Sequence, residues 1–242
     1  METILQAVQD YFQCPWAACA CYYPTARMIE VRNGVLQYGS PDSQHPLGTA
    51  WELLLLDQIS PQLCYVHVGY CREPGYCHEI LTFLRLDSGW KLVSVLRAEA
   101  TARYSSACSD PYQEQEILRA VAQTLMTYCD AVYTLDAERA LSVFTKEAHM
   151  LHPVDGDQFA DVRCEVFRER WAGLPDPTTL RLSRYTHIYH IELLSRDVVM
   201  AKVGVAKLND HFNDYLFCVN TSDGWRIAHK LTQFLWLNPE EL

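Results

Sequence analysis

The clearest pattern of apolar and polar positions lies in the second half of the chain. Apolar residues recur every three or four positions over 113–133, the spacing of a helix that buries one face. Asp136 precedes a second helical segment, 137–144, whose free N–H groups its carboxylate can cap. A short strand over 148–152 follows, and a third helix, capped by Asp161, is predicted to reach Trp171. The pattern then changes to that of strands.

The strand-like part consists of four stretches rich in β-branched and aromatic residues, over 181–194, 198–208, 212–221 and 225–235. Short polar turns separate them. Helices followed by consecutive strands are typical of the α+β class, whereas a doubly wound sheet alternates helix and strand. We therefore predict an α+β unit in which three helices pack on a sheet.

The same plan occurs twice along the chain. Gly89-Trp90-Lys91-Leu92 resembles Gly224-Trp225-Arg226-Ile227 at an offset of 135 residues. Ala26-Arg27-Met28-Ile29 resembles Ala148-His149-Met150-Leu151 at an offset of 122 residues. Two constant offsets in the same order indicate an internal repeat. The sequence thus predicts one unit over 1–104 and a second over 112–242, joined by a polar linker.

Composition narrows the class of protein. The chain has 242 residues, of which 49% are hydrophobic and 21% charged, a globular composition. Its formal net charge of −10 argues against a nucleic-acid partner. The N-terminal residues lack the pattern of a signal peptide, and the longest aliphatic run, Leu53 to Leu56, is too short to span a membrane. We expect a cytoplasmic protein.

The ten cysteines contain no Cys-x-x-Cys pair, so we expect free thiols in a reducing compartment. The histidine pairs His149/His152 and His187/His190 are three residues apart. On a strand such residues point to opposite faces and cannot chelate one ion. The sequence therefore predicts neither a metal site nor a cofactor.

The second unit resembles the nuclear transport factor two-like superfamily, which includes ketosteroid isomerase, scytalone dehydratase and polyketide cyclases. It is most similar to the branch described as "putative lumazine-binding". The motifs that carry the resemblance are Tyr128-Cys129-Asp130-Ala131-Val132-Tyr133, Asp136-Ala137-Glu138, Phe212-Asn213-Asp214-Tyr215-Leu216 and Trp225-Arg226-Ile227. The resemblance implies a cone in which three helices close a curved, mostly antiparallel sheet. Members dimerise through their sheets, so two units in one chain imply an internal pseudo-dimer.

Comparison with ketosteroid isomerase implies a candidate catalytic pair. The oxyanion-stabilising tyrosine of that family falls on Tyr128, and its general base falls on His152. A tyrosine hydroxyl can stabilise a developing enolate while an imidazole moves a proton. The second oxyanion acid of the family falls near Phe217, which cannot donate a hydrogen bond. The alternative is that Tyr128 packs in the core and His152 is an exposed histidine.

Two further histidines are candidates for the same wall. His187 shares a strand face with Tyr185 and Tyr189, which is either a pocket wall or plain core. His229 follows the alternation of Trp225 and Ile227 and should line the cone, with Lys230 pointing away unless a bulge exchanges the two.

The predicted ligand-binding residues are Asp130, Tyr133 and Tyr215, which belong to the motifs of the branch, and Trp171. An unpaired carboxylate on an apolar helix is costly, so Asp130 either bonds an arginine or the backbone, or serves the pocket. Trp171 forms either a lid over the mouth of the cone or part of the core.

The first unit differs at the catalytic positions. The offset of 122 places Gln6 at the position of Tyr128, Val8 at that of Asp130 and Glu30 at that of His152. We therefore expect the first unit to be a scaffold and the second to hold the site.

The leading hypothesis is a cofactor-free isomerase, dehydratase or cyclase that moves a proton on a small carbonyl or phenolic substrate, hydrophobic or aromatic. The alternatives are a non-catalytic carrier or sensor with the same pocket, and an interaction scaffold whose cone is filled by its own side chains.

Overall fold

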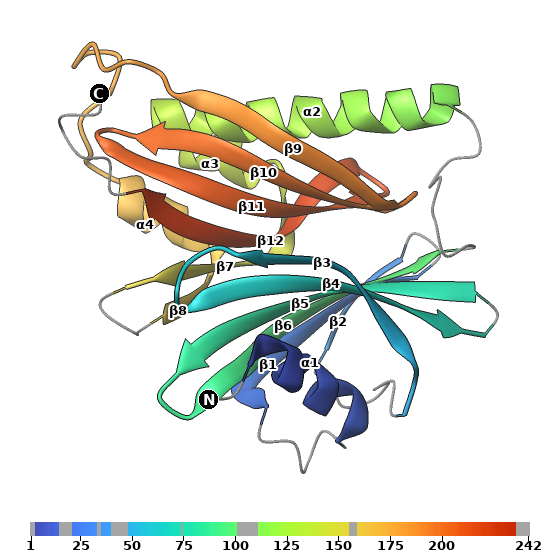
Figure 1. Cartoon of the computed structure of the whole chain (residues 1–242). Coiled ribbons are helices and arrows are strands. Elements are labelled where there is room, and N and C mark those ends of the chain that lie inside the picture. The colour runs from blue at the N-terminus through green and yellow to red at the C-terminus, as the bar shows by residue number, and fades with distance from the viewer. Residues whose placement is uncertain are drawn as a thin grey trace. The chain divides into compact units, whose positions relative to one another are not determined.

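The chain divides into two compact units, Met1–Ala107 and Cys108–Leu242 (Figure 1). The structure is a computed structural model, and it describes residues 3–14, 21–32, 35–39, 48–73, 75–100, 111–154 and 159–235. The predicted linker over 105–111 lies outside the described residues except for Pro111. None of the helices in the described ranges combines the length and the apolar character that crossing a bilayer requires.

The first unit is a six-stranded sheet with one described helix, α1 (Ile4–Gln13). Its strands run in the order β2-β1-β6-β5-β4-β3, and only the β1–β6 pair is parallel. The bounds are β1 (Tyr22–Arg32), β2 (Val35–Gly39), β3 (Trp51–Gln58), β4 (Leu63–Arg72), β5 (Gly75–Leu86) and β6 (Gly89–Ala100).

The second unit repeats this topology. Its strands run in the order β8-β7-β12-β11-β10-β9, and only the β7–β12 pair is parallel. The helices are α2 (Pro111–Thr134), α3 (Ala137–Leu141) and α4 (Phe167–Trp171), and the strands are β7 (Phe144–Pro153), β8 (Phe159–Arg163), β9 (Thr186–Ser195), β10 (Val198–Lys207), β11 (Asp210–Thr221) and β12 (Gly224–Leu235). The long helix α2 runs along one face of this sheet, and the core lies between them (Figure 1).

The predicted α+β class and the mostly antiparallel sheets are confirmed. The prediction of three helices in each unit is wrong, because only the second unit has three in its described residues. In the described part of the first unit α1 stands alone. In the second unit the predicted third helix starts too early, because residues 159–163 form β8 and pair with β7. Asp161 does not cap a helix; its carboxylate contacts His149 Nδ1 at 3.0 Å. Strand pairing here overrides a helix-like spacing of apolar residues.

Two glycines at the offset of 135 mark the repeat structurally. A Cβ on Gly69 would come within 1.9 Å of the Tyr76 hydroxyl, and one on Gly204 within 2.9 Å of the rings of Tyr185 and Tyr189. In both units a tyrosine ring therefore lies directly over the backbone of the same strand, a close approach that only glycine permits.

Candidate functional site

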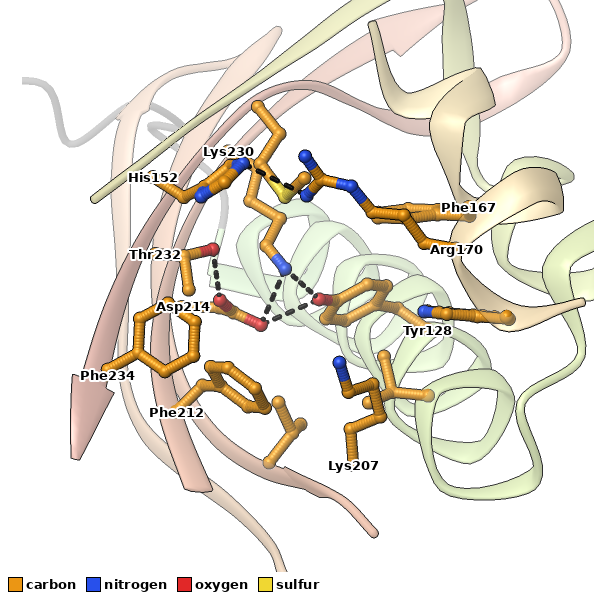
Figure 2. Close-up of a pocket in the computed structure, with 14 residues that line it drawn as sticks. Tyr128, His152, Phe167, Arg170, Lys207, Phe212, Asp214, Lys230, Thr232 and Phe234 are labelled. Atoms are coloured by element: carbon orange, nitrogen blue, oxygen red, sulfur yellow. Dashed lines mark hydrogen bonds and ion pairs between the residues drawn. The ribbon is translucent and has the colours of Figure 1, made fainter. Parts of the chain in front are cut away.

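A pocket opens between the helices and the sheet of the second unit (Figure 2). Its volume is about 100 Å³, room for about three water molecules at the ~30 Å³ that each occupies in the liquid, or for a small organic ring. The walls are mostly apolar and aromatic and include Val132, Met150, Phe167, Trp171, Val205, Phe212 and Phe234. Its polar residues are Tyr128, His152, Arg170, Lys207, Asp214, Lys230 and Thr232.

A buried network forms one wall of this pocket. Asp214, which is fully buried, accepts a hydrogen bond from the Tyr128 hydroxyl at 2.6 Å and one from the Thr232 hydroxyl at 2.8 Å. The Lys230 ammonium lies 3.0 Å from the same carboxylate and donates to the Tyr128 oxygen at 2.6 Å. Figure 2 shows the three groups converging from α2, β11 and β12. The carboxylate is thus paired and hydrogen-bonded, as a buried charge must be.

The surroundings of Tyr128 hold its hydroxyl in the neutral form. Burial raises the pKa of Tyr128 well above its ordinary value, and the negative charge of Asp214 and the hydrogen bond to it raise the pKa further. Its single proton is directed at Asp214, so a ligand oxygen in the pocket must find another donor. Lys230 has three N–H donors, two of which are directed at Tyr128 and Asp214, and it is better placed to meet such an oxygen.

A β-bulge decides which residue of β12 faces the pocket. Phe217 pairs with His229, but the next residue of β11, Cys218, pairs with Ile227, so Ala228 is an extra residue. The bulge turns Lys230 inward and His229 outward, where the imidazole stacks on Phe217 with ring centroids 5.8 Å apart. The prediction that His229 lines the cone is therefore wrong, and the exchange with Lys230 takes place.

Three of the predicted site residues come together at the pocket. Tyr128 and His152 both line it, and so does Trp171, whose ring stacks on Phe167 at 4.8 Å. The Nε2 atom of His152 lies 2.9 Å from Arg170 Nη1; because a guanidinium only donates, Nε2 accepts this bond.

The other predicted residues lie elsewhere. Asp130 forms ion pairs with Arg139, at 3.0 Å, and with Arg184, the structural alternative considered for it. The Tyr133 hydroxyl donates to the carbonyl oxygen of Leu182 at 3.0 Å. Neither residue lines the pocket.

His187 and Tyr215 belong to the face of the sheet opposite the pocket. His187 pairs with Gly204, which alternates with the core residues Val203 and Val205. Tyr215 follows Asp214 on β11, and its ring lies 4.9 Å from the Lys202 amino group. The prediction that a second imidazole faces the cone is therefore wrong for His187, as it is for His229.

Four charged residues line the pocket without having been predicted to do so: Asp214, Lys230, Arg170 and Lys207. A signal for Asp214 was present, because the offset of 135 aligns it with Glu79, another acid inside an apolar strand. Asp214 lies near Phe217, but it accepts hydrogen bonds from Tyr128 and Thr232 and so does not supply the donor that was expected to be missing there. Lys207 aligns with Arg72 at the same offset. Nothing in the sequence reveals that Arg170 meets His152, because α4 and β7 meet only in the folded unit.

The first unit carries a related buried network. Tyr11 donates to Glu79 at 2.9 Å, as Tyr128 does to Asp214. The buried helix residues Ala7, Val8, Tyr11 and Phe12 align with Thr124, Leu125, Tyr128 and Cys129 at an offset of 117, and all eight are buried. The residue equivalent to Tyr128 is therefore Tyr11 and not Gln6, which is exposed. The proton donor expected to be absent from the first unit is present.

Metal-ligand geometry is not found among the residues that the structure describes: no three His, Cys, Asp or Glu side chains there are grouped as an ion would require.

Residues 116–233 match the family described as "Putative lumazine-binding". This confirms the resemblance predicted for the second unit. The match lies wholly within the unit that holds the pocket and excludes the first unit. No curated protein matches the chain significantly.

Several solved structures are similar to about half of the chain. An NTF-2-like protein of unknown function from Silicibacter pomeroyi is 17% identical, with a TM-score of 0.45 over 50% of this chain and 98% of its own. An NTF2-like protein of unknown function from Shewanella baltica is 12% identical, with a TM-score of 0.46 over 53% and 98%. A ketosteroid isomerase-like protein from Erwinia carotovora atroseptica is 12% identical, with a TM-score of 0.39 over 50% and 98%.

Proposed function

We propose that the second unit binds a small, flat, oxygenated molecule in the pocket beside Tyr128, Asp214 and Lys230. The observation that carries this proposal is the make-up of the pocket: apolar and aromatic walls around a few fixed polar groups, as in small-molecule sites generally. The walls supply burial for the ring of a ligand, and Lys230 supplies a hydrogen bond to its oxygen.

The buried network supports this proposal because it fixes the polar wall before a ligand arrives. Asp214 holds Lys230 and Tyr128 in place through bonds of 2.6–3.0 Å. Binding a ligand oxygen to Lys230 then costs little conformational entropy, because the lysine side chain is already ordered. The name of the matching family points to lumazine, a bicyclic ring with two carbonyl oxygens, as a suitable first probe.

Titration of the full chain with lumazine, followed by the change in its fluorescence, tests the proposal. We expect saturable binding of one molecule per chain. Trp171→Leu should weaken it, because the ring lines the pocket, whereas Arg168→Gln on the same helix should not, because Arg168 pairs with Glu138 outside the pocket. Absence of saturable binding by lumazine and by smaller flat oxygenated molecules, or lumazine binding that Trp171→Leu leaves unchanged, would refute the proposal.

A second candidate function is proton transfer on the bound molecule, as in an isomerase, dehydratase or cyclase. The observation that favours it is that Tyr128 and His152 line one pocket, with Lys230 between the tyrosine and the carboxylate. In this version Lys230 stabilises the developing oxyanion and Tyr128 positions Lys230, while His152 takes up the proton at Nε2 after the bound molecule has displaced that nitrogen from Arg170.

The proton-transfer candidate predicts a separation of binding from turnover. His152→Gln should leave binding within about threefold and abolish turnover of an enolisable ketone, because glutamine keeps a polar side chain but cannot act as a base. Exchange of the α-protons of the ketone with solvent deuterium, measured by NMR, is the readout. Exchange that persists in His152→Gln would exclude His152 as the base.

We also propose, from the resemblance, that the two units form an internal pseudo-dimer with the first as scaffold. From the free cysteines we propose that the protein is cytoplasmic with reduced thiols. Burial raises the pKa of Cys129, Cys164 and Cys218 to about 12 each, so these thiols are poor nucleophiles at neutral pH.

A further inference from the structure

The pocket of the second unit is lined by three cationic side chains, Arg170, Lys207 and Lys230, and by one acidic side chain, Asp214. Asp214 and Lys230 neutralise each other at 3.0 Å. Two positive charges therefore remain at the pocket of a protein whose formal net charge is −10. The sign of the pocket is opposite to that of the chain as a whole.

Arg170 has no acidic partner within the described ranges. Its contact among these residues is the hydrogen bond that it donates to His152 Nε2 at 2.9 Å, so that nitrogen carries no proton. Arg168, two residues earlier on α4, is different, because it forms an ion pair with Glu138 away from the pocket. Of these two arginines, the one that faces the pocket is the one that pairs with no carboxylate of the described residues.

Lys207 is held only weakly. Its amino group lies 3.9 Å from Asp210, whose side chain is 59% exposed, and 5.7 Å from the centre of the Phe212 ring. An exposed ion pair of that length contributes little. In Figure 2, Arg170 and Lys207 lie on either side of the Lys230–Asp214–Tyr128 cluster in this view. Both cations are therefore available to a ligand.

The aromatic side chains of the pocket occur in two pairs. The rings of Phe167 and Trp171 are stacked at 4.8 Å, and those of Phe212 and Phe234 lie 4.8 Å apart with an interplanar angle of 59°. Aromatic walls of this kind favour a planar ring, and guanidinium and ammonium groups beside them favour a carboxylate.

We propose that the ligand of this pocket is a small aromatic acid, bound as its anion, whose carboxylate is held by Arg170 or Lys207 and whose ring lies between the aromatic walls. This inference rests on the proposed function, since it names the chemical class that the same pocket selects. A carboxylate that pairs with Arg170 would also compete with His152 for the guanidinium.

The matched probes benzoate and benzamide test the charge of the ligand without changing its shape. Titration of the full chain, followed through the Trp171 indole NMR resonance, should show benzoate binding at least tenfold more tightly than benzamide at low salt. The resonance is identified by its loss in Trp171→Phe. Because salt screens partly exposed charges, the preference should shrink in 0.5 M NaCl.

Variants that remove one positive charge each show which side chain causes the preference for benzoate over benzamide. Arg170→Gln and Lys207→Gln should each reduce the preference for benzoate severalfold, and the double variant should abolish it, whereas Arg168→Gln should leave it unchanged. Equal binding of benzoate and benzamide would overturn the inference while leaving the proposed function intact. Failure of lumazine, benzoate and benzamide alike to bind would overturn both. A preference for benzoate that survives the double variant would also contradict the inference.

Discussion

The two units share a strand order and a buried tyrosine–carboxylate pair, yet differ in the side chains around it. Val205 of the pocket corresponds to Tyr70 at the offset of 135, and Thr232 corresponds to Arg97. His152 corresponds to Glu30 at the offset of 122. In the first unit the larger residues pack onto the carboxylate itself: Tyr70 donates to Glu79 at 2.8 Å and Arg97 at 2.6 Å.

The comparison indicates that the buried tyrosine–carboxylate pair does not depend on the side chains that form the pocket of the second unit. Both units keep a buried acid that accepts a bond from a helix tyrosine, which indicates that this pair serves the fold. In the second unit, smaller neighbours leave space beside the pair, and Lys230 takes part from β12. In the first unit, Arg97 pairs with both Glu79 and Glu30 in the same region.

The largest expected effect is the loss of the buried acid in the first unit. Glu79→Gln leaves the fully buried Arg97 without its strongest partner, which should cost about 3–5 kcal/mol in the free energy of unfolding. Asp214→Asn should cost less, because Lys230 borders an open pocket. Urea denaturation of the full chain measures both. The exposed Glu73→Gln is the control, and a loss below that of Asp214→Asn would contradict the comparison.

A reciprocal exchange of Tyr70 and Val205 tests whether the size of these two side chains determines how much space lies beside the buried acid in each unit. Tyr70→Val removes a buried ring and its bond to Glu79, and should cost about 3 kcal/mol. Val205→Tyr places a ring into existing space, and should change stability by no more than ~1 kcal/mol while weakening lumazine binding more than tenfold. Unchanged lumazine affinity in Val205→Tyr would show that the ligand lies elsewhere.

Removing the tyrosine hydroxyls should affect the two units equally in stability and unequally in binding. Tyr11→Phe and Tyr128→Phe each delete one hydrogen bond to a buried carboxylate, a loss of about 1.5–2 kcal/mol in the free energy of unfolding. Tyr128→Phe should also change lumazine affinity, because Lys230 loses its partner in the pocket. If Tyr11→Phe altered binding as strongly, the assignment of the site to the second unit would fail.

The smallest effect is on the pH dependence of stability. The pKa of both Tyr11 and Tyr128 is raised in the folded state, chiefly by burial. The stability that this contributes is complete below the ordinary tyrosine pKa of 10.0 and declines as the pH rises above it, because the unfolded chain then loses protons that the folded chain keeps. Free energies of unfolding from pH 9 to pH 11 should therefore fall less steeply in Tyr128→Phe and in Tyr11→Phe. A slope identical to that of the wild type would contradict the burial of these hydroxyls.

The sequence predicted the architecture better than the site because the two depend on different features. Repeated motifs at the offset of 135 located matching strands, since β5 and β11 share their length and their pairing. The first helices of the two units are related by a third offset, 117, and no motif shared by the two sequences indicates it. The offset of 122 therefore aligned Gln6 with Tyr128, although Tyr11 is the equivalent residue.

The orientation of side chains along β12 depends on a local feature, the β-bulge. Alternation along β12 predicts His229 at the cone, and the single extra residue Ala228 reverses every side chain after it. A bulge of this kind depends on the neighbouring strand, so a pattern read along one strand cannot locate it. The charged pocket residues Arg170 and Lys207 come from elements that approach each other only through the fold of the unit.

The most direct test of the central claim is a crystal structure of the full chain soaked with lumazine. We predict that the ring occupies the pocket of the second unit between Trp171 and Phe212, with an oxygen within hydrogen-bond distance of Lys230. Density for lumazine in the first unit, or on the sheet face that carries His187 and Tyr215, with this pocket left empty, would contradict it.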